Sequence, residues 1–188
     1  MWKRIKKRYY KLWPITSKKN SLENDKLTLS PSDFGFHNSL KKNNKIFFLD
    51  FEYFGWDDPV KLTADFIWHP SNIKNKDILK KWKENMIKLF SNDKEFEIRL
   101  NASLPLYGIR WIVIILNEFL PEYSTRRKLA RNSNLYEQKK EKSLQIKKAL
   151  YYCKKINNFL LKIKINLITY HVLKNYELSR FRRKSKKT

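Results

Sequence analysis

Three polar side chains near the N-terminus have the types and the spacing that phosphoryl transfer requires. Asp33 and Asn38 lie five positions apart, and Asp50 ends the apolar run Ile-Phe-Phe-Leu-Asp. A carboxylate in the first position can accept the proton of a hydroxyl group, and an Asn with a second Asp can hold Mg²⁺ against nucleotide phosphates. This chemistry depends on positioning and charge neutralisation, which three short side chains on a rigid backbone can supply.

The stretch from Leu29 to Pro70 resembles the aminoglycoside phosphotransferase and choline kinase-like family, a branch of the protein-kinase-like fold. The segment LSPSDFGFHNSL is similar to the catalytic loop of that family, and FFLDFEYFGWDDPVKLTADF is similar to its metal-binding segment and the helix that follows. The resemblance implies that Asp33 is the catalytic base and that Asn38 and Asp50 are the metal ligands. It also implies Mg²⁺ as the metal ion and ATP as the phosphoryl donor.

Four further carboxylates are candidates for supporting roles. By resemblance, Asp58 is the structural Asp that braces the catalytic loop. Glu52 lies two positions beyond the second metal ligand and is a candidate for a carboxylate close to the metal. Glu118 and Glu122 flank the end of an apolar segment, in a region that shapes the acceptor pocket of related enzymes. A solvated helix end is the alternative for these last two residues.

The sequence departs from the family in two ways. Pro31 occupies the position where the family usually has a His, two residues before the catalytic Asp. The only glycines are at 35, 55 and 108, so no G-x-G-x-x-G can be written. About 28 residues precede the loop, too few for a five-stranded lobe at ordinary strand lengths. We therefore expect the C-terminal lobe alone over residues 1–179, followed by a basic, disordered tail over residues 180–188.

The expected fold is α+β and mostly α, with one small β-hairpin at the active site. The apolar run over residues 45–51 predicts a buried strand, which pairs with the residues around Ser39-Leu40 and turns at Lys42-Asn43-Asn44. This hairpin places Asn38 and Asp50 at the same end, as a shared metal ion requires.

Helical spacing predicts most of the other elements. A helix over residues 1–13 ends at Pro14, and another begins with an Asp cap and Pro59 and ends near Trp68. Further helices are expected over residues 76–90, 95–102, 106–120 (bounded by Pro105 and Pro121), 135–162 and 164–180.

Composition limits the class of protein. The 188 residues carry a formal charge of +24 and 41% apolar residues, which indicate one ordered domain that attracts polyanions. Compositional drift towards Lys, Asn and Ile is the competing explanation for the charge.

The single cysteine, Cys153, and the lack of a secretory signal favour the cytoplasm. One cysteine and three histidines at unrelated spacings do not predict a zinc site, and His37 is interpreted as a hydrogen-bonding loop residue.

The resulting expectation is a small-molecule kinase whose acceptor is a hydroxyl group and whose N-terminal lobe is either a separate polypeptide or lost by truncation. An aminoglycoside acceptor is disfavoured, because such polycations require acidic pockets. Two hypotheses of other classes stay open. In the first hypothesis the chain is an inactive kinase-like remnant or scaffold. In the second it is a basic module that binds nucleic acid or an anionic membrane.

Overall fold

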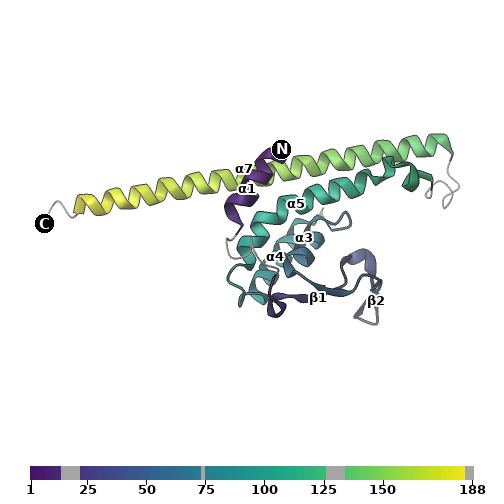
Figure 1. Ribbon diagram of the computed structural model, residues 1–188, viewed down its shortest axis with the longest axis horizontal. Coiled ribbons are helices and arrows are strands. Elements are labelled where there is room, and N and C mark those ends of the chain that lie inside the picture. The colour runs from purple at the N-terminus through teal and green to yellow at the C-terminus, as the bar shows by residue number, and fades with distance from the viewer. Residues whose placement is uncertain (14–21, 73–74, 126–133, 185–188) are drawn as a thin grey trace.

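The computed structural model describes residues 1–13, 22–72, 75–125 and 134–184, with side chains in the last helix described as far as Leu161. This part of the chain is mostly helical and carries two short two-stranded sheets, which confirms the α+β, mostly α class. The long helix α7 lies along one side, α5 packs against it, α3 packs on α5, and the strands lie beyond α3 (Figure 1).

The first helix, α1 (Trp2–Leu12), ends before Pro14 as predicted. Ile5 is its fully buried residue and belongs to the main hydrophobic core. Arg4 donates a 2.9 Å hydrogen bond to the side-chain oxygen of Asn157 in α7. The helix therefore packs on the body of the protein, where it contacts α5.

A short antiparallel pair precedes the α3 helix. Strand β1 (Thr28–Ser30) pairs with β4 (Gly55–Asp57), so that Ser30 lies opposite Gly55. A 3₁₀ turn, η1 (Asn24–Lys26), comes before β1. The sequence analysis did not anticipate this pairing, because both strands have only three residues and no alternating pattern.

The expected hairpin is present. Strand β2 (Ser39–Lys42) pairs antiparallel with β3 (Lys45–Phe48), directly after the 3₁₀ turn η2 (Phe36–Asn38). Asn43 and Asn44 form the connection with φ of 47° and 59°. Positive φ at both positions is typical of the two-residue turns that match the twist of a hairpin, and Asn tolerates it better than most residues. Both strands are exposed to solvent, so the expected buried strand is wrong.

Two helices follow with the expected caps. Helix α3 (Pro59–Trp68) begins with the Asp58 carboxylate, which accepts a 2.9 Å hydrogen bond from the Val60 amide. It ends at His69, directly before Pro70. Helix α4 (Lys76–Leu89) begins with Asn75, whose side chain accepts from the Ile78 amide.

Helix α5 (Phe96–Leu116) continues through Pro105, which corrects the expected boundary at that residue. A proline inside a helix removes one amide and leaves the carbonyl four positions earlier without its partner. Here the side chain of Arg8 donates to that carbonyl, Asn101 O, at 2.6 Å. The helix is therefore uninterrupted because α1 supplies the missing donor.

The core lies where α3, α5 and α7 meet. A Cβ added at Gly108 would lie 2.9 Å from Ile156 and 3.0 Å from Trp68, so the glycine sets the approach of the three helices. Trp68 donates its indole hydrogen to Leu104 O, and the Tyr152 hydroxyl donates to Trp68 O. With the 3₁₀ turn η3 (Asn117–Phe119), α5 forms the described segment that is long and apolar enough to cross a membrane, yet it packs against α1, α3 and α7.

The last helix, α7 (Leu135–Lys184), has 50 residues and no break near position 163, where the sequence predicted two helices. The helix also crosses the expected boundary between the lobe and the tail at residue 180. Residues 180–184 are therefore helical, and residues 185–188 of the expected tail lie outside the described residues.

Candidate functional site

The loop that carries Asp33 is fixed by an unusual turn. The Asp33 amide donates to Pro31 O at 2.7 Å across Ser32, whose φ is 62°. Such a three-residue turn with positive φ is rare and strained, and it persists only where the surroundings impose it. Two contacts do so, because Ser32 N donates to Ser30 Oγ at 3.1 Å and Lys61 Nζ donates to Ser32 Oγ at 2.8 Å.

Asn38 joins the loop to the hairpin. Its side-chain Nδ2 donates to Asp33 O at 2.9 Å, and its backbone carbonyl accepts from the Leu49 amide at 2.9 Å. Asp50 follows directly. The expected position of Asn38 and Asp50 at one end of the hairpin is therefore confirmed for the backbone.

Asp50 and Glu52 lie on the surface just beyond β3. Asp50 has a φ of 62°, so its backbone is in the left-handed region that non-glycine residues seldom adopt. Glu52 sits in the turn closed by the hydrogen bond from Phe54 N to Phe51 O. Both side chains are exposed, and an exposed carboxylate is accessible to an ion or to a phosphate-bound metal.

The contacts of the Asp58 side chain are with the start of α3 and with Arg99 in the interior, rather than with the Asp33 loop. It caps α3 and lies 3.5 Å from the guanidinium of the buried Arg99, which also pairs with Asp93 at 2.7 Å. Burial raises the pKa of Asp58, and the Val60 amide and Arg99 partly oppose that shift. The contact between α3 and the loop comes instead from Lys61, which also pairs with Asp57.

Two histidines lie against Asp33: His37, interpreted from the sequence as a hydrogen-bonding loop residue, and His69, for which the sequence indicated no role. His37 Nε2 is 3.3 Å from Asp33 Oδ2, and His69 Nε2 is 3.8 Å from Asp33 Oδ1. The two imidazole rings stack with centroids 3.9 Å apart and an angle of 8° between their planes. Burial first, and then the neighbouring His37, lowers the pKa of His69 to about 4, so His69 is neutral near pH 7. The sequence offered one signal for this cluster: a His at the end of the helix that follows the loop.

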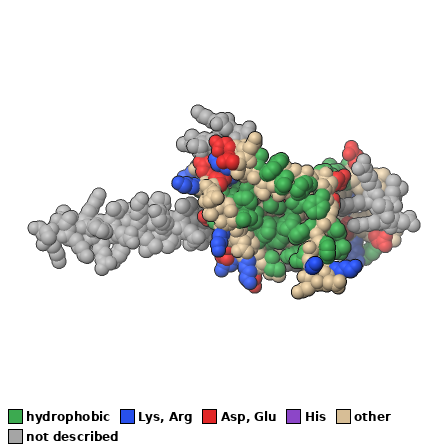
Figure 2. All heavy atoms as spheres, turned by 90° about the horizontal axis from the view of Figure 1, so that it is seen from below, with side chains coloured by type: hydrophobic (Ala, Val, Ile, Leu, Met, Phe, Trp, Pro, Cys, Tyr) green, Lys and Arg blue, Asp and Glu red, His purple; other side chains and the backbone are tan. Residues whose placement is uncertain are grey.

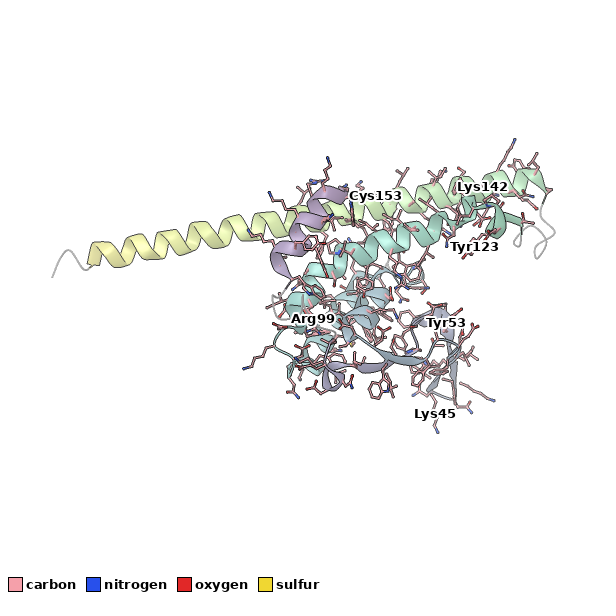
Figure 3. The ribbon with its side chains drawn as sticks, viewed as in Figure 1. Lys45, Tyr53, Arg99, Tyr123, Lys142 and Cys153 are labelled. Carbon is pink, nitrogen blue, oxygen red and sulfur yellow. The ribbon has the colours of Figure 1, made fainter. Side chains whose placement is uncertain are left out.

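Glu118 and Glu122 lie elsewhere. Glu118 is buried in η3, which packs against α7, and Glu122 is exposed just after it. Figure 3 labels the adjacent Tyr123 near the end of α5, between Lys142 of α7 and Tyr53 beside the hairpin. The main contacts of η3 are therefore with α5 and α7 rather than with the Asp33 loop.

An aromatic groove of about 320 Å³ borders the loop. Phe34 stacks on Trp82 at 5.5 Å and lies 5.1 Å from Phe48 of the hairpin, and Phe66 contacts Trp82 at 4.3 Å between ring centroids. These contacts attach the hairpin to α3 and α4 through one side of β3.

Uncovered apolar side chains line the groove and continue on the other side of the hairpin, and together they are called the apolar face. Its side chains come from the loop, the hairpin and the segment that follows, and each is at least 45% exposed. Figure 2 shows hydrophobic side chains gathered on this side of the molecule, with charged residues towards the edges. Exposed apolar side chains in such number are typical of a region that another protein covers. The residues of this apolar face are Leu29, Phe36, Leu40, Ile46, Phe47, Phe48, Leu49, Phe51, Tyr53, Phe54 and Trp56.

Comparisons of the chain with protein-family models, with curated proteins and with solved structures found no match.

Proposed function

We propose that this chain is the base-bearing and metal-binding half of a Mg²⁺- and ATP-dependent phosphotransferase that acts on a small-molecule hydroxyl. The observation that carries the proposal is the position of Asn38, whose hydrogen bonds to Asp33 O and from Leu49 N join the loop to the residue before Asp50. These bonds support the proposal because they bring together the backbones of Asp33, Asn38 and Leu49, the residue before Asp50.

Each group has a distinct role in this proposal. Asp33 would accept the proton of the attacking hydroxyl, and its half-exposed carboxylate is open to a substrate. Asn38 Oδ1 and the Asp50 carboxylate would hold Mg²⁺, since hard oxygen ligands suit this ion. When bound, Mg²⁺ neutralises charge on the phosphates. Lys61 and the strained turn at Ser32 fix the backbone direction of the base.

The apolar face supports a second component. Phosphoryl transfer in kinases needs a loop and a Lys above the phosphates as well as the metal below them. A separate polypeptide that carries those groups would dock on the apolar face and cover the hairpin. Positioning contributes on the order of 7–11 kcal/mol to such reactions. We therefore expect the chain alone to show no phosphotransferase activity above background.

Nuclear magnetic resonance with Mn²⁺ in place of Mg²⁺ tests the metal site without requiring turnover. In the presence of ATP, we expect paramagnetic broadening of backbone amides over residues 33–38 and 48–51. Asp50→Asn should remove this broadening, whereas the matched change Glu52→Gln, two positions away, should retain most of it.

Three results would count against the proposal. Broadening that is insensitive to Asp50→Asn would show that the ion binds elsewhere. Broadening spread over the Lys-rich helices would favour the basic polyanion-binding module. Robust phosphoryl transfer by the isolated chain that persists in Asp33→Asn would exclude Asp33 as the base.

A further inference from the structure

Asp33, His37 and His69 form a cluster whose ligand types differ from those of a magnesium site. Each residue offers one donor atom, and the three atoms all lie within 4.8 Å of one another. Asp33 Oδ2 lies 3.3 Å from His37 Nε2, and Asp33 Oδ1 lies 3.8 Å from His69 Nε2. Ligand atoms about 2.0–2.2 Å from a tetrahedral zinc ion lie roughly 3.3 Å apart. Small side-chain rotations would therefore close this cluster around one ion.

We propose that Asp33, His37 and His69 bind one divalent transition-metal ion of the zinc type, with a fourth coordination position open to solvent. Two imidazole nitrogens and one carboxylate oxygen form a donor set that such ions prefer, whereas Mg²⁺ selects oxygen ligands. The Asp33 side chain is 48% exposed, which leaves a path for the ion. This site goes beyond the proposed phosphotransferase and does not depend on it.

A chain of hydrogen bonds behind His69 sets which nitrogen faces Asp33. Asn72 is buried, and its Nδ2 donates to Phe66 O at 3.1 Å, which orients its Oδ1 towards Ser71. The Ser71 hydroxyl donates to that Oδ1 at 2.8 Å. Its oxygen can then accept from His69 Nδ1–H, at 2.6 Å.

In the tautomer with the proton on Nδ1, the free nitrogen is Nε2, the atom that faces Asp33. The Ser71 amide donates to Nδ1 at 3.2 Å and favours the other tautomer, so an ion at Nε2 would displace that proton while the Ser71 hydroxyl accepts from Nδ1. A partner behind a histidine ligand that fixes its tautomer and ring direction is a recurring feature of metal sites.

His37 is the ligand with freedom to move. It lies in the short turn η2 and is more exposed than His69, which packs edge-on against Trp111 at 4.8 Å. A Cβ added at Gly35 would lie 2.7 Å from His37 Nδ1, so the glycine gives the ring its space beside His69. Rotation of His37 out of the parallel stack would direct its Nε2 towards an ion shared with Asp33.

An ion at this cluster would engage the carboxylate that phosphoryl transfer uses as a base. Zinc binding and proton acceptance at Asp33 are therefore mutually exclusive. Asp50, by contrast, lies outside the described cluster. This separation allows the two metal sites to be tested independently.

The full chain, freed of metal with a chelator, should bind one Zn²⁺ per chain by isothermal titration calorimetry. Co²⁺ should give the intense visible absorption of a tetrahedral site. We expect His37→Ala and His69→Gln each to weaken Zn²⁺ binding by more than about 10-fold, and Ser71→Ala by about 10-fold. His171→Ala removes the remaining histidine and is the matched control, with unchanged affinity.

Circular dichroism verifies that each variant is folded, and the exposed His37 keeps the test decisive if His69→Gln unfolds. Asp50→Asn should leave Zn²⁺ binding intact, so failure of the zinc site is distinguishable from failure of the magnesium site. Absence of 1:1 binding by the unmodified chain, or affinity insensitive to His37→Ala, would overturn the proposal.

Discussion

The guanidinium of Arg8 donates a 2.6 Å hydrogen bond to the carbonyl oxygen of Asn101, the acceptor that Pro105 leaves without its helical amide. The two residues are separated by 93 positions in the chain. Helix α5 therefore replaces the backbone hydrogen bond lost at Pro105 with one donated by a side chain of α1. This contact also attaches α1 to the middle of α5.

The contact predicts a coupling between Arg8 and Pro105. Arg8→Met should lower the free energy of unfolding by about 1–3 kcal/mol, because it leaves a partly buried carbonyl without a donor. In a Pro105→Ala background, the restored amide of residue 105 can donate to the Asn101 carbonyl. Arg8→Met should then lower the free energy of unfolding by about 1 kcal/mol less than it does in the unmodified chain. Urea unfolding of the four proteins measures the coupling. Arg4→Met, on the same helix, is the control, and equal costs in both backgrounds would contradict the prediction.

Arg99 predicts a larger effect. Its side chain is buried and lies between Asp93 and Asp58, so Arg99→Met would leave two carboxylates without their cation. We expect a loss of about 3–5 kcal/mol in the free energy of unfolding. Arg99→Lys should recover only part of it, because an ammonium group cannot reproduce the planar fork. A thermal midpoint for Arg99→Met equal to that of the unmodified chain would show that the pair is not required.

Lys61 predicts a local effect rather than a global one. Lys61→Met removes the contact to Ser32 and the pair with Asp57, so the loop should open more often. Hydrogen exchange of amides over residues 31–38 should accelerate, with a change in global stability of about 1 kcal/mol or less. Lys80→Met breaks the exposed pair with Glu84 and is the matched control. Unchanged exchange in the loop would show that Lys61 is not its brace.

His69 predicts a pH dependence of stability. Burial and His37 lower its folded pKa to about 4, with Asp33 opposing the shift, from an ordinary value of 6.5. Below pH 6.5 the unfolded chain binds a proton that the folded chain does not, so stability falls as the pH falls towards 4. The contribution is on the order of 2–3 kcal/mol. Unfolding with a chelator present, compared between the unmodified chain and His69→Gln, isolates it. Parallel pH profiles for the two proteins would contradict the prediction.

Several elements were predictable because their signals are local. Pro14 ends α1, Asp58 caps α3 directly before Pro59, and Asn43-Asn44 form the hairpin turn. In each case the determining residues are neighbours in sequence. The continuation of α5 through Pro105 was not predictable in this way, because the donor that replaces the lost amide belongs to a distant helix.

The candidate site shows the same distinction between features set by neighbouring residues and features set by distant ones. The predicted hairpin correctly placed the backbones of Asn38 and Asp50 at one end, since hairpin geometry is short-range. The approach of His69 depends on how the loop folds against the end of α3, and on the room that Gly35 leaves for His37. Neither the packing of the loop against α3 nor the space beside Gly35 can be inferred from the spacing of residues in the sequence.

The exposure of both hairpin strands has a thermodynamic consequence for the proposed enzyme. An isolated two-stranded hairpin is marginally stable at best in water, yet this one positions the Asn38 and Asp50 ligands. A partner that covers the apolar face would order the hairpin, and nucleotide with Mg²⁺ would order the same segment from its other end. The two binding events would then share one ordering cost. By linkage, each must tighten the other by the same factor, so partner affinity itself becomes a readout of the nucleotide site.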